Sequence, residues 1–458
     1  MQQILQLLKQ EGYPCVDESF YSKIAEWFTW YRGKVLEFHT YRQYNGKSMI
    51  TRQRKSMGMA KTVAEDWANL CLNEKVEIVI DGEAEGTPVH EVLKKNNFRV
   101  RGNQLVELAF ALGTGAIIEY FSGDDIAMDY VRAGMIFPLK WDNGEIIECA
   151  FGSERTIGKE RFIYLNIHKK DGNTYVIQNK MFKKLNEAGE STDATVQVDL
   201  PEGMIDEIRT NSEIPLFQII KPNIVNNFNP DIPLGLSVYA NAIDQLKGLD
   251  LVYDSYINEF MLGKKRIIIP LSMARMIMEE DGSSTPLFDV NDTEFYAMPL
   301  GDDKKIEEIN MSLRHESHEA GLKTALNLLS LKCGMGNNRY SFEHGTAKTA
   351  TEVISEKSEL YQSLKKHELI LEKALIDMVY AIAGMLGVSV NEVKINFDDS
   401  IIEDETKKRL NDLQDVNAGI LNRWEYRMEH YGEDEETAKQ MADEANGEGN
   451  TLDMFGGA

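Results

Sequence analysis

The stretch that decides the fold runs from residue 233 to residue 262 and reads PLGLSVYANAIDQLKGLDLVYDSYINEFML. Its apolar residues recur at helical spacing, which predicts an amphipathic helix over 237–262. A compact insert follows at 264–300, then a second helix at 311–333 and a loop rich in Gly and Asn. A last helix at 349–386 would span about 55 Å at a rise of ~1.5 Å per residue. Long helices around an insert are typical of an architectural part that repeats in a larger assembly.

The chain of 458 residues carries a formal charge of −24 and has a sequence pI near 4.9. A DNA-binding domain usually shows a basic footprint, so the plain interpretation is that the protein binds no nucleic acid tightly. A protein that lets DNA slide through it also gains from an acidic lining, because phosphate contacts would hold the DNA in place. Net charge leaves both interpretations open.

Length and composition predict two or three folded domains of ~150 residues each, since 43% of the residues are hydrophobic. No apolar run reaches the ~18 residues that cross a bilayer, and the first residues lack the pattern of a signal peptide. We therefore expect no membrane span. The cysteines lie far apart without a CxxC pair, which favours a reducing cytoplasm over a zinc site or a disulfide scaffold. They are Cys15, Cys71, Cys149 and Cys333.

The patterns along the chain predict an α+β fold. Apolar residues at helical spacing, including Phe20, Ile24 and Trp27, indicate mostly helices up to about residue 79. Short β-runs separated by turns such as Asp142-Asn143-Gly144 follow at 115–220 and form a β-module.

Finer predictions concern the insert and the C-terminal part. The insert is predicted to hold a strand at 267–270 and a helix at 273–278. A strand at 393–397 is predicted to return to the β-module. From residue 398 the composition turns acidic but keeps helical patterns, and the Gly-rich end from residue 446 is predicted to be disordered.

Nucleotide-binding motifs are incomplete. Gly46-Lys47-Ser48 resembles the end of a phosphate-binding loop, but Tyr41 stands where the first glycine belongs, so a surface turn is favoured. Gly113-Thr114-Gly115 lacks the third glycine of a dinucleotide fingerprint, and a helix C-cap leading into a strand explains it better.

Catalytic and metal-binding patterns are equally weak. His315 and His318 lie three residues apart on a predicted helix, whereas zincins place two histidines four apart, so a solvated helix face is favoured. Acidic pairs occur in predicted turns, where such residues are common for local hydrogen bonding. We expect no enzymatic activity, no metal and no cofactor. The pairs are Asp124 with Asp125, Glu279 and Glu280 with Asp281, and Asp302 with Asp303.

Basic residues cluster at Lys264, Lys265 and Arg266, where the first long helix ends and the insert begins. Two interpretations stay open. The cations neutralise the helix C-terminus, which is worth about 0.3–1 kcal/mol, or they contact nucleic acid or an acidic partner.

Three groups of residues point to a known family. The first joins 233–237, PLGLS, to 243–250, IDQLKGLD, and to Asn258-Glu259-Phe260. It resembles the start of the stem in portal proteins of tailed double-stranded-DNA bacteriophages, of the type common in phages of Gram-positive hosts.

The other two groups follow in the order of that family. Residues 349–353, TATEV, with Ser358, Tyr361 and Glu368, resemble the segment after the tunnel loop of portals. The last group resembles the acidic C-terminal part of portals and comprises 396–401, NFDDSI, and 416–420, VNAGI.

The resemblance implies a ring, usually of twelve subunits, at one vertex of the capsid, whose channel serves DNA packaging and ejection. It implies a portal-type fold with these parts: a wing at 1–232, a first stem helix at 233–262, a small α/β clip at 263–310, a second stem helix at 311–333, a tunnel loop at 334–348, a long wing helix and return strand at 349–397, an α-helical crown at 398–445 and a disordered tail at 446–458.

The resemblance also implies site residues. Gly334, Gly336 and Gly345 would give the tunnel loop unusual backbone angles. The residues expected to face DNA there are Asn337, Asn338, Arg339, Tyr340 and Lys348. The clip residues expected to bind partners are Lys264, Lys265, Arg266, Glu279, Glu280 and Asp281.

The implied partners are the other subunits of the ring, double-stranded DNA bound transiently without sequence preference, the large terminase subunit, the head–tail adaptor, and the major capsid and scaffolding proteins. The protein would assemble in the host cytoplasm and act in the virion as a structural component. Two alternatives stay open: another head-assembly protein, such as a minor capsid or adaptor component, and an enzyme acting on nucleic acid. The former would not need two long helices packed together, and the latter would show metal- or nucleotide-dependent turnover.

Overall fold

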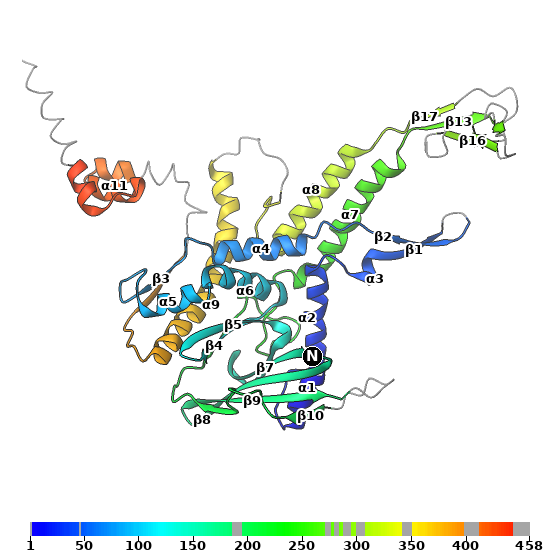
Figure 1. The fold of residues 1–458 in the computed structure, drawn as a ribbon. Coiled ribbons are helices and arrows are strands. Elements are labelled where there is room, and N and C mark those ends of the chain that lie inside the picture. The colour runs from blue at the N-terminus through cyan, green and yellow to red at the C-terminus, as the bar shows by residue number, and fades with distance from the viewer. Residues whose placement is uncertain are drawn as a thin grey trace, which may run out of the picture. The chain divides into compact units, whose positions relative to one another are not determined.

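Figure 1 shows the computed structural model of the chain, which describes residues 2–44, 47–185, 195–270, 276–278, 284–286, 295–298, 307–340, 350–397 and 412–442. By its internal contacts the chain divides into two units, Met1–Asn396 and Phe397–Ala458. Helices and strands are mixed along the first unit, so the predicted α+β class is confirmed.

Helices make up most of the first hundred residues because buried apolar side chains recur along them at helical spacing. Asp17 begins α2 by accepting a hydrogen bond from the Ser19 amide at 2.8 Å. Trp27 of α2 and Trp67 of α4 are fully buried and anchor this part of the core. The helices are α1 (Gln2–Gln10), α2 (Glu18–Tyr31), α3 (Leu36–His39), α4 (Met59–Cys71), α5 (Pro88–Lys95) and α6 (Phe98–Leu112).

A β-hairpin that the sequence patterns did not predict interrupts these helices. Strand β1 (Thr40–Tyr44) pairs antiparallel with β2 (Met49–Gln53), and residues 47 and 48 lie between them. We call residues 40–53 the ribbon. Lys47 and Ser48 therefore lie in a hairpin connection, as the surface-turn interpretation of Gly46-Lys47-Ser48 requires.

The strands between residues 115 and 220 form two sheets that share a core. The larger sheet has the order β10-β9-β8-β7-β6, with β11 also paired to β9, and the smaller has the order β12-β4-β5. Side chains such as Ile136, Phe151 and Phe217 form one buried cluster between them. Asn143 and Gly144 adopt φ angles of 48° and 79° between β6 and β7, so the predicted hairpin turn is confirmed. The strands are β4 (Gly115–Ser122), β5 (Asp125–Arg132), β6 (Ile136–Asp142), β7 (Glu145–Ile157), β8 (Glu160–Asp171), β9 (Thr174–Lys184), β10 (Thr195–Val198), β11 (Glu207–Arg209) and β12 (Phe217–Ile220), with a short 3-10 helix η1 (Ala133–Met135) after β5.

The two helices that flank the insert lie side by side (Figure 1), and α7 (Ile243–Leu262) packs against α8 (His315–Lys332). Both begin later than predicted. The chain before α7 forms only a 3-10 turn, η2 (Ala240–Ala242). The Val238 amide donates instead to the Phe110 carbonyl at 3.0 Å, so this backbone is held by α6 and cannot extend the helix.

Residues 266–270, 276–278, 284–286 and 295–298 of the insert are strands. β13 (Arg266–Pro270) lies between β16 (Phe295–Met298) and β17 (Glu307–Ile309), which confirms the strand predicted at 267–270. The helix predicted at 273–278 is wrong where the structure describes it, because β14 (Met276–Met278) pairs with β15 (Ser284–Pro286). A short apolar run does not distinguish a helix from a strand by periodicity, and a pairing partner decides the matter here.

The long helix α9 (Ala350–Leu386) confirms the helix predicted at 349–386 within the described residues. The strand after it, β18 (Val393–Asn396), was predicted to return to the β-module, and this prediction is wrong. It pairs antiparallel with β3 (Glu77–Ile80), which follows α4. The Asp81 carboxylate accepts the amides of Asn391 and Glu392 at 2.9 Å each, which fixes the chain at this place.

The second unit contains α11 (Arg423–Tyr431) and further helical residues at 412–417 and 435–442. Asn422 and Glu425 form a capping box at the start of α11, and Gly432 ends it with a φ of 65°. The helical patterns predicted in this acidic part are therefore confirmed over its described residues. The tail predicted to be disordered lies outside them.

Candidate functional site

The pair of helices α7 and α8 is joined by Glu259. Its two carboxylate oxygens accept hydrogen bonds from Arg314, at 3.1 Å from Nε and 2.7 Å from Nη2, which is the planar bidentate geometry of a strong pair. The hydrogen bonds from Arg314 lower the pKa of Glu259 to about 2. His318 Nε2 lies 3.5 Å from the same carboxylate. Glu259 therefore closes the end of the helix pair next to the insert.

The histidines predicted to lie on a solvated helix face belong to this arrangement. His318 faces Glu259, while His315 is exposed and its Nδ1 lies 3.4 Å from the Leu313 carbonyl. Within the described part of the chain, no group of three or more His, Cys, Asp or Glu side chains is placed to hold a metal ion.

A second joint holds the ribbon to α7. Asp250 is buried, and its Oδ2 lies 2.9 Å from His39 Nε2 and accepts the Ser56 hydroxyl at 2.8 Å. Its Oδ1 accepts the Met57 amide at 2.9 Å. One turn further along α7, Asp254 accepts the Lys55 amide at 2.9 Å. The residues that flank the ribbon on both sides are thus bonded to one face of α7.

The helix pair also exposes apolar side chains, which we call its apolar flank. Leu262 is 55% exposed and Leu328 is 52% exposed, although residues of this type usually lie inside a protein. Apolar patches of this kind mark surfaces that bind another macromolecule. The members on or next to the two helices are Leu251, Phe260, Met261, Leu262, Met311, Leu313, Leu328 and Leu331.

The segment after α8 turns back on itself through residues with positive φ. Gly334 has a φ of 76° and Gly336 a φ of 71°, so the unusual angles predicted for these glycines are confirmed. The Ser330 hydroxyl donates to the Gly336 carbonyl at 2.6 Å, and Trp67 Nε1 donates to the Cys333 carbonyl at 3.1 Å. The described start of this loop is therefore packed on α4. Gly345 lies outside the described residues.

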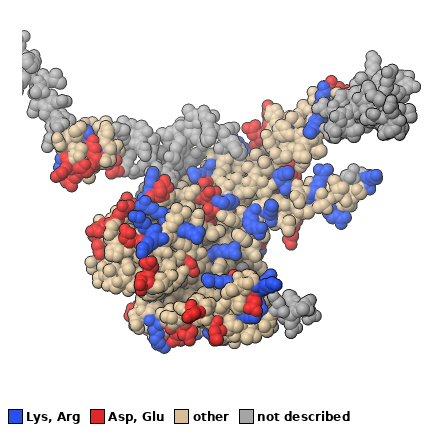
Figure 2. Space-filling view, in the orientation of Figure 1, with Lys and Arg blue, Asp and Glu red and all other residues tan. Residues whose placement is uncertain are grey.

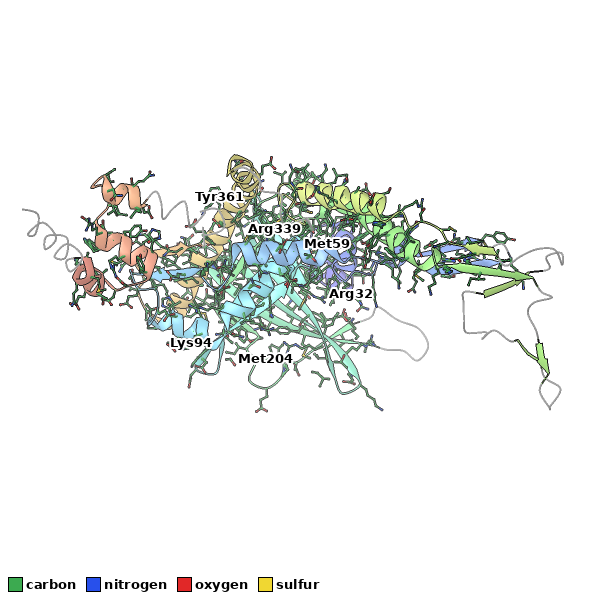
Figure 3. All side chains as sticks on the ribbon, turned by 90° about the horizontal axis from the view of Figure 1, so that it is seen from above. Arg32, Met59, Lys94, Met204, Arg339 and Tyr361 are labelled. Atoms are coloured by element: carbon green, nitrogen blue, oxygen red, sulfur yellow. The ribbon has the colours of Figure 1, made fainter. Side chains whose placement is uncertain are left out.

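The four described residues that were predicted to face DNA lie together in one turn. Asn337 is exposed, and Asn338 accepts the Asn327 side-chain amide at 2.9 Å. Arg339 Nε lies 3.4 Å from Asp66 Oδ2 of α4, and Figure 3 shows Arg339 beside that helix. Burial, together with the nearby Asp66 carboxylate, raises the pKa of Tyr340. Lys348 lies outside the described residues.

The basic cluster at the end of α7 is partly neutralised within the chain. Arg266 Nη2 donates to the Leu262 carbonyl at 3.5 Å, as a cation at a helix C-terminus does. Lys265 Nζ lies 2.8 Å from Glu308 of β17, while Lys264 is exposed. Glu279, Glu280 and Asp281 lie outside the described residues.

The C-cap interpretation of Gly113-Thr114-Gly115 is confirmed, because Gly113 follows α6 with a φ of 87°. This corner also meets the stretch before α7: the Gly235 amide donates to the Thr114 hydroxyl at 3.0 Å. Sequence reasoning had not connected the two segments.

Two buried groups sit at the centre of the first unit. His367 of α9 lies between the rings of Trp67 and Phe110, and its Nδ1 accepts the Asn223 amide at 3.0 Å. Burial lowers the pKa of His367 to about 3, so the ring is neutral near pH 7. Glu119 of β4 is fully buried, and neither carboxylate oxygen has a hydrogen-bond partner among the described residues. Burial raises the pKa of Glu119 to about 8.

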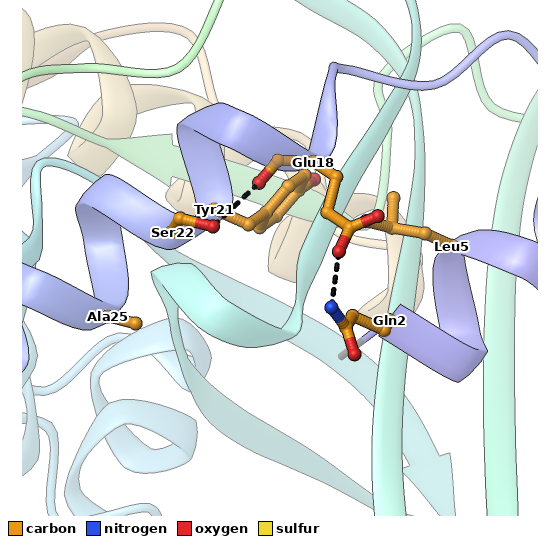
Figure 4. A pocket seen from close by; sticks show the side chains of 6 residues that line it. All are labelled: Gln2, Leu5, Glu18, Tyr21, Ser22 and Ala25. Atoms are coloured by element: carbon orange, nitrogen blue, oxygen red, sulfur yellow. Dashed lines mark hydrogen bonds between the residues drawn. The ribbon is translucent and has the colours of Figure 1, made fainter.

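A small pocket lies between α1 and α2 (Figure 4). Glu18 accepts a hydrogen bond from the Gln2 side-chain amide there, and the Tyr21 hydroxyl donates to the Ile136 carbonyl at 2.9 Å. The polar groups of this pocket thus already have hydrogen-bond partners within the chain. We interpret the pocket as a gap between two packed helices.

Sequence reasoning missed two features. Asp250 and Asp254, four residues apart on the buried face of an amphipathic helix, could have been flagged as carboxylates in need of partners. A second basic cluster lies outside the one at Lys264, because residues 38–64 hold six Lys and Arg and no Asp or Glu. A charge count in a sliding window would have found that stretch.

The fold and the site define a structural class of protein: an α+β body carrying a helix pair, an insert at its end and an exposed apolar flank. A family model, described as phage portal protein, SPP1 Gp6-like, matches residues 15–451. The chain therefore belongs to the phage portal proteins. A search of curated proteins finds no match. None of the described helices combines the length and the hydropathy of a membrane span.

Proposed function

We propose that this protein is the portal, or head–tail connector, whose subunits form a ring at one vertex of the capsid. The channel of the ring is the path for DNA packaging and ejection. The proposal rests mainly on the packed pair of helices α7 and α8. Their exposed apolar side chains need a neighbouring subunit to cover them. Head-to-tail contacts between identical subunits close into a ring when the rotation between neighbours allows it.

In this proposal α7 and α8 form the stem and the insert between them forms the clip, which docks the large terminase subunit and later the head–tail adaptor. Residues 334–348 form the tunnel loop, residues 1–232 and 349–397 the wing, and residues 398–445 the crown. The exposed residues among the described predicted DNA contacts are Asn337 and Arg339, and of these Arg339 is held near Asp66. A net charge of −24 favours sliding over retention of DNA.

The alternative is another head-assembly protein, such as a minor capsid or adaptor component. Such a protein does not require two long helices that pack together around an insert, and the contact between α7 and α8 supports the portal. The portal family is a family of structural proteins, and the function proposed here involves no chemistry on the DNA.

Imaging of the purified full-length protein by negative-stain electron microscopy, with native mass spectrometry to count subunits, tests the proposal. We expect closed rings with a central channel wide enough for a B-form duplex. Monomers at every protein and salt concentration would contradict the ring. Rings without a channel would favour the alternative.

A further inference from the structure

The ribbon lies within a basic stretch of an otherwise acidic chain. Residues 38–64 contain six basic and no acidic residues, which leaves 44 of the 50 Lys and Arg to set against all 74 Asp and Glu. Figure 2 shows Lys and Arg side chains gathered over this arm. Lys61, which lies in α4, is paired with Glu65 and Glu107, at 2.9 and 2.7 Å. The remaining members are Arg42, Lys47, Arg52, Arg54 and Lys55.

The pairing register of the ribbon divides its side chains into two faces. Tyr41 lies opposite Arg52, and both are half-buried on one face. The other face carries Arg42 opposite Thr51 and Tyr44 opposite Met49, and these four side chains are all exposed. Tyr44 is 62% exposed and Met49 is 52% exposed. The second face, which we call the outer face, thus combines a cation with an apolar cross-strand pair.

The root of the ribbon is fixed while its outer face is open. The Arg54 guanidinium lies over the rings of Phe38 and Tyr41, at 4.7 and 4.6 Å from their centroids. The Arg54 amide donates to the His39 carbonyl at 2.7 Å, and His39 contacts Asp250 of α7. A two-stranded hairpin is only marginally stable in water unless it packs on another surface. A hairpin that is fixed at its base and exposed on one face is therefore well suited to bind a partner with that face.

We propose that the outer face of the ribbon docks on an acidic surface of a second copy of this chain and straps neighbouring subunits together. This inference rests on the proposed ring. Charge complementarity favours a second copy as the partner, because the chain outside residues 38–64 is strongly acidic. The apolar pair of Tyr44 and Met49 fits a protein surface, where such residues are buried on contact. DNA is the less suitable partner, because a ribbon that bound the phosphates would hold a duplex that has to slide through the channel.

The test compares two double variants of the full-length protein. The first, Arg42→Glu with Met49→Asp, reverses the charge and removes the apolar side chain of the outer face. The matched control, Lys94→Glu with Val100→Asp, makes the same changes at two exposed positions of α5 and α6. Circular dichroism and the thermal midpoint establish that both variants fold. Ring dissociation is then followed by mass photometry over a dilution series at 50, 150 and 500 mM salt, in the presence and absence of duplex DNA.

We expect the ribbon variant to dissociate at protein concentrations about tenfold higher or more, as loss of about 1.4 kcal/mol per contact requires, with the control unchanged. The rings of the unsubstituted protein should also weaken as salt rises. Equal dissociation of the two variants would contradict the proposed role of the ribbon but not the proposal that the protein forms a ring. Unchanged rings that lose only DNA binding would assign the ribbon to DNA. Absence of rings in the unsubstituted protein would instead refute the proposed function.

Discussion

Gly113 and Gly235 touch backbone to backbone. A Cβ added to Gly235 would lie 2.2 Å from the Gly113 carbonyl oxygen, and one added to Gly113 would lie 2.4 Å from the Gly235 carbonyl oxygen. This contact brings the corner between α6 and β4 against the stretch that leads into α7. It explains why a glycine stands between Leu234 and Leu236.

Substitution of Gly235 by Ala is therefore expected to destabilise the first unit. The methyl group would push the two backbones apart, at a cost of about 1–3 kcal/mol. Urea unfolding followed by tryptophan fluorescence measures the change. The control is Gly248→Ala, where an added Cβ meets nothing within 4 Å inside α7 and alanine favours the helix. Equal stability of the two variants would show that the backbone contact is not tight.

Loss of the Asp250 carboxylate is expected to free the ribbon. In Asp250→Ala the side chains of His39 and Ser56 and the amide of Met57 lose their partner, which costs about 1–3 kcal/mol for each buried polar group left unsatisfied. Limited proteolysis at Arg42, Arg52 and Lys55, read by mass spectrometry, should become faster. Asp244→Ala on the exposed side of the same helix is the control. If both variants are cleaved at the rate of the unsubstituted protein, Asp250 does not hold the root.

The buried carboxyl of Glu119 predicts a pH dependence of stability. Its pKa is raised from 4.5 to about 8, so between these values the folded state keeps a proton that the unfolded state releases. The stability contributed by this group is complete below pH 4.5 and falls as pH rises to about 8, with a limiting slope of about 1.4 kcal/mol per pH unit. Glu119→Gln should remove this fall.

Urea unfolding of Glu119→Gln and of the unsubstituted protein at pH 5, 6, 7 and 8 tests this. The difference between the two should grow with pH in favour of the variant. His168 and His367, whose pKa values burial lowers to about 3, give the opposite slope below pH 6.5 in both proteins and cancel in the difference. Glu74→Gln at an exposed position is the control. Parallel profiles for Glu119→Gln and the unsubstituted protein would mean that Glu119 is ionised in the folded state.

The apolar flank of the helix pair predicts a defect in assembly. Leu328→Glu with Leu331→Glu places two charges where the proposed ring buries leucines, so rings should be lost while the monomer stays folded. Size-exclusion chromatography with light scattering measures the mass. Val225→Glu with Leu36→Glu, at residues that are 76% and 74% exposed and do not belong to α7 or α8, is the control. Rings of normal mass in the leucine variant would place the subunit contact elsewhere.

Local patterns in the sequence predicted much of this fold. The helix that buries Phe20, Ile24 and Trp27 and the turn at Asn143 and Gly144 are confirmed, because period and turn chemistry are properties of neighbouring residues. The partner of β18 was wrong because strand pairing depends on contacts far apart in the chain. The ribbon was missed because neither of its faces is apolar, so its strands lack the alternation that marks a half-buried sheet.

The candidate site was predictable only in part. The glycine angles at Gly334 and Gly336 follow from the residue type, and the structure bears them out. The environment of Arg339 and Tyr340 could not be predicted, because Asp66, which lies beside them, is more than 270 residues earlier in the chain. Which side chains of the loop touch DNA stays a prediction.

The Asp250 carboxylate has a consequence for how subunits come together. Because one side chain of α7 contacts the residues on both sides of the ribbon, His39 before it and Ser56 and Met57 after it, the ribbon and α7 cannot swing independently. A subunit that arrives with a pre-set angle between its arm and its helix loses less conformational freedom on association than one with a loose hinge. In the proposed ring, the curvature of the growing arc would then be fixed before the second subunit binds.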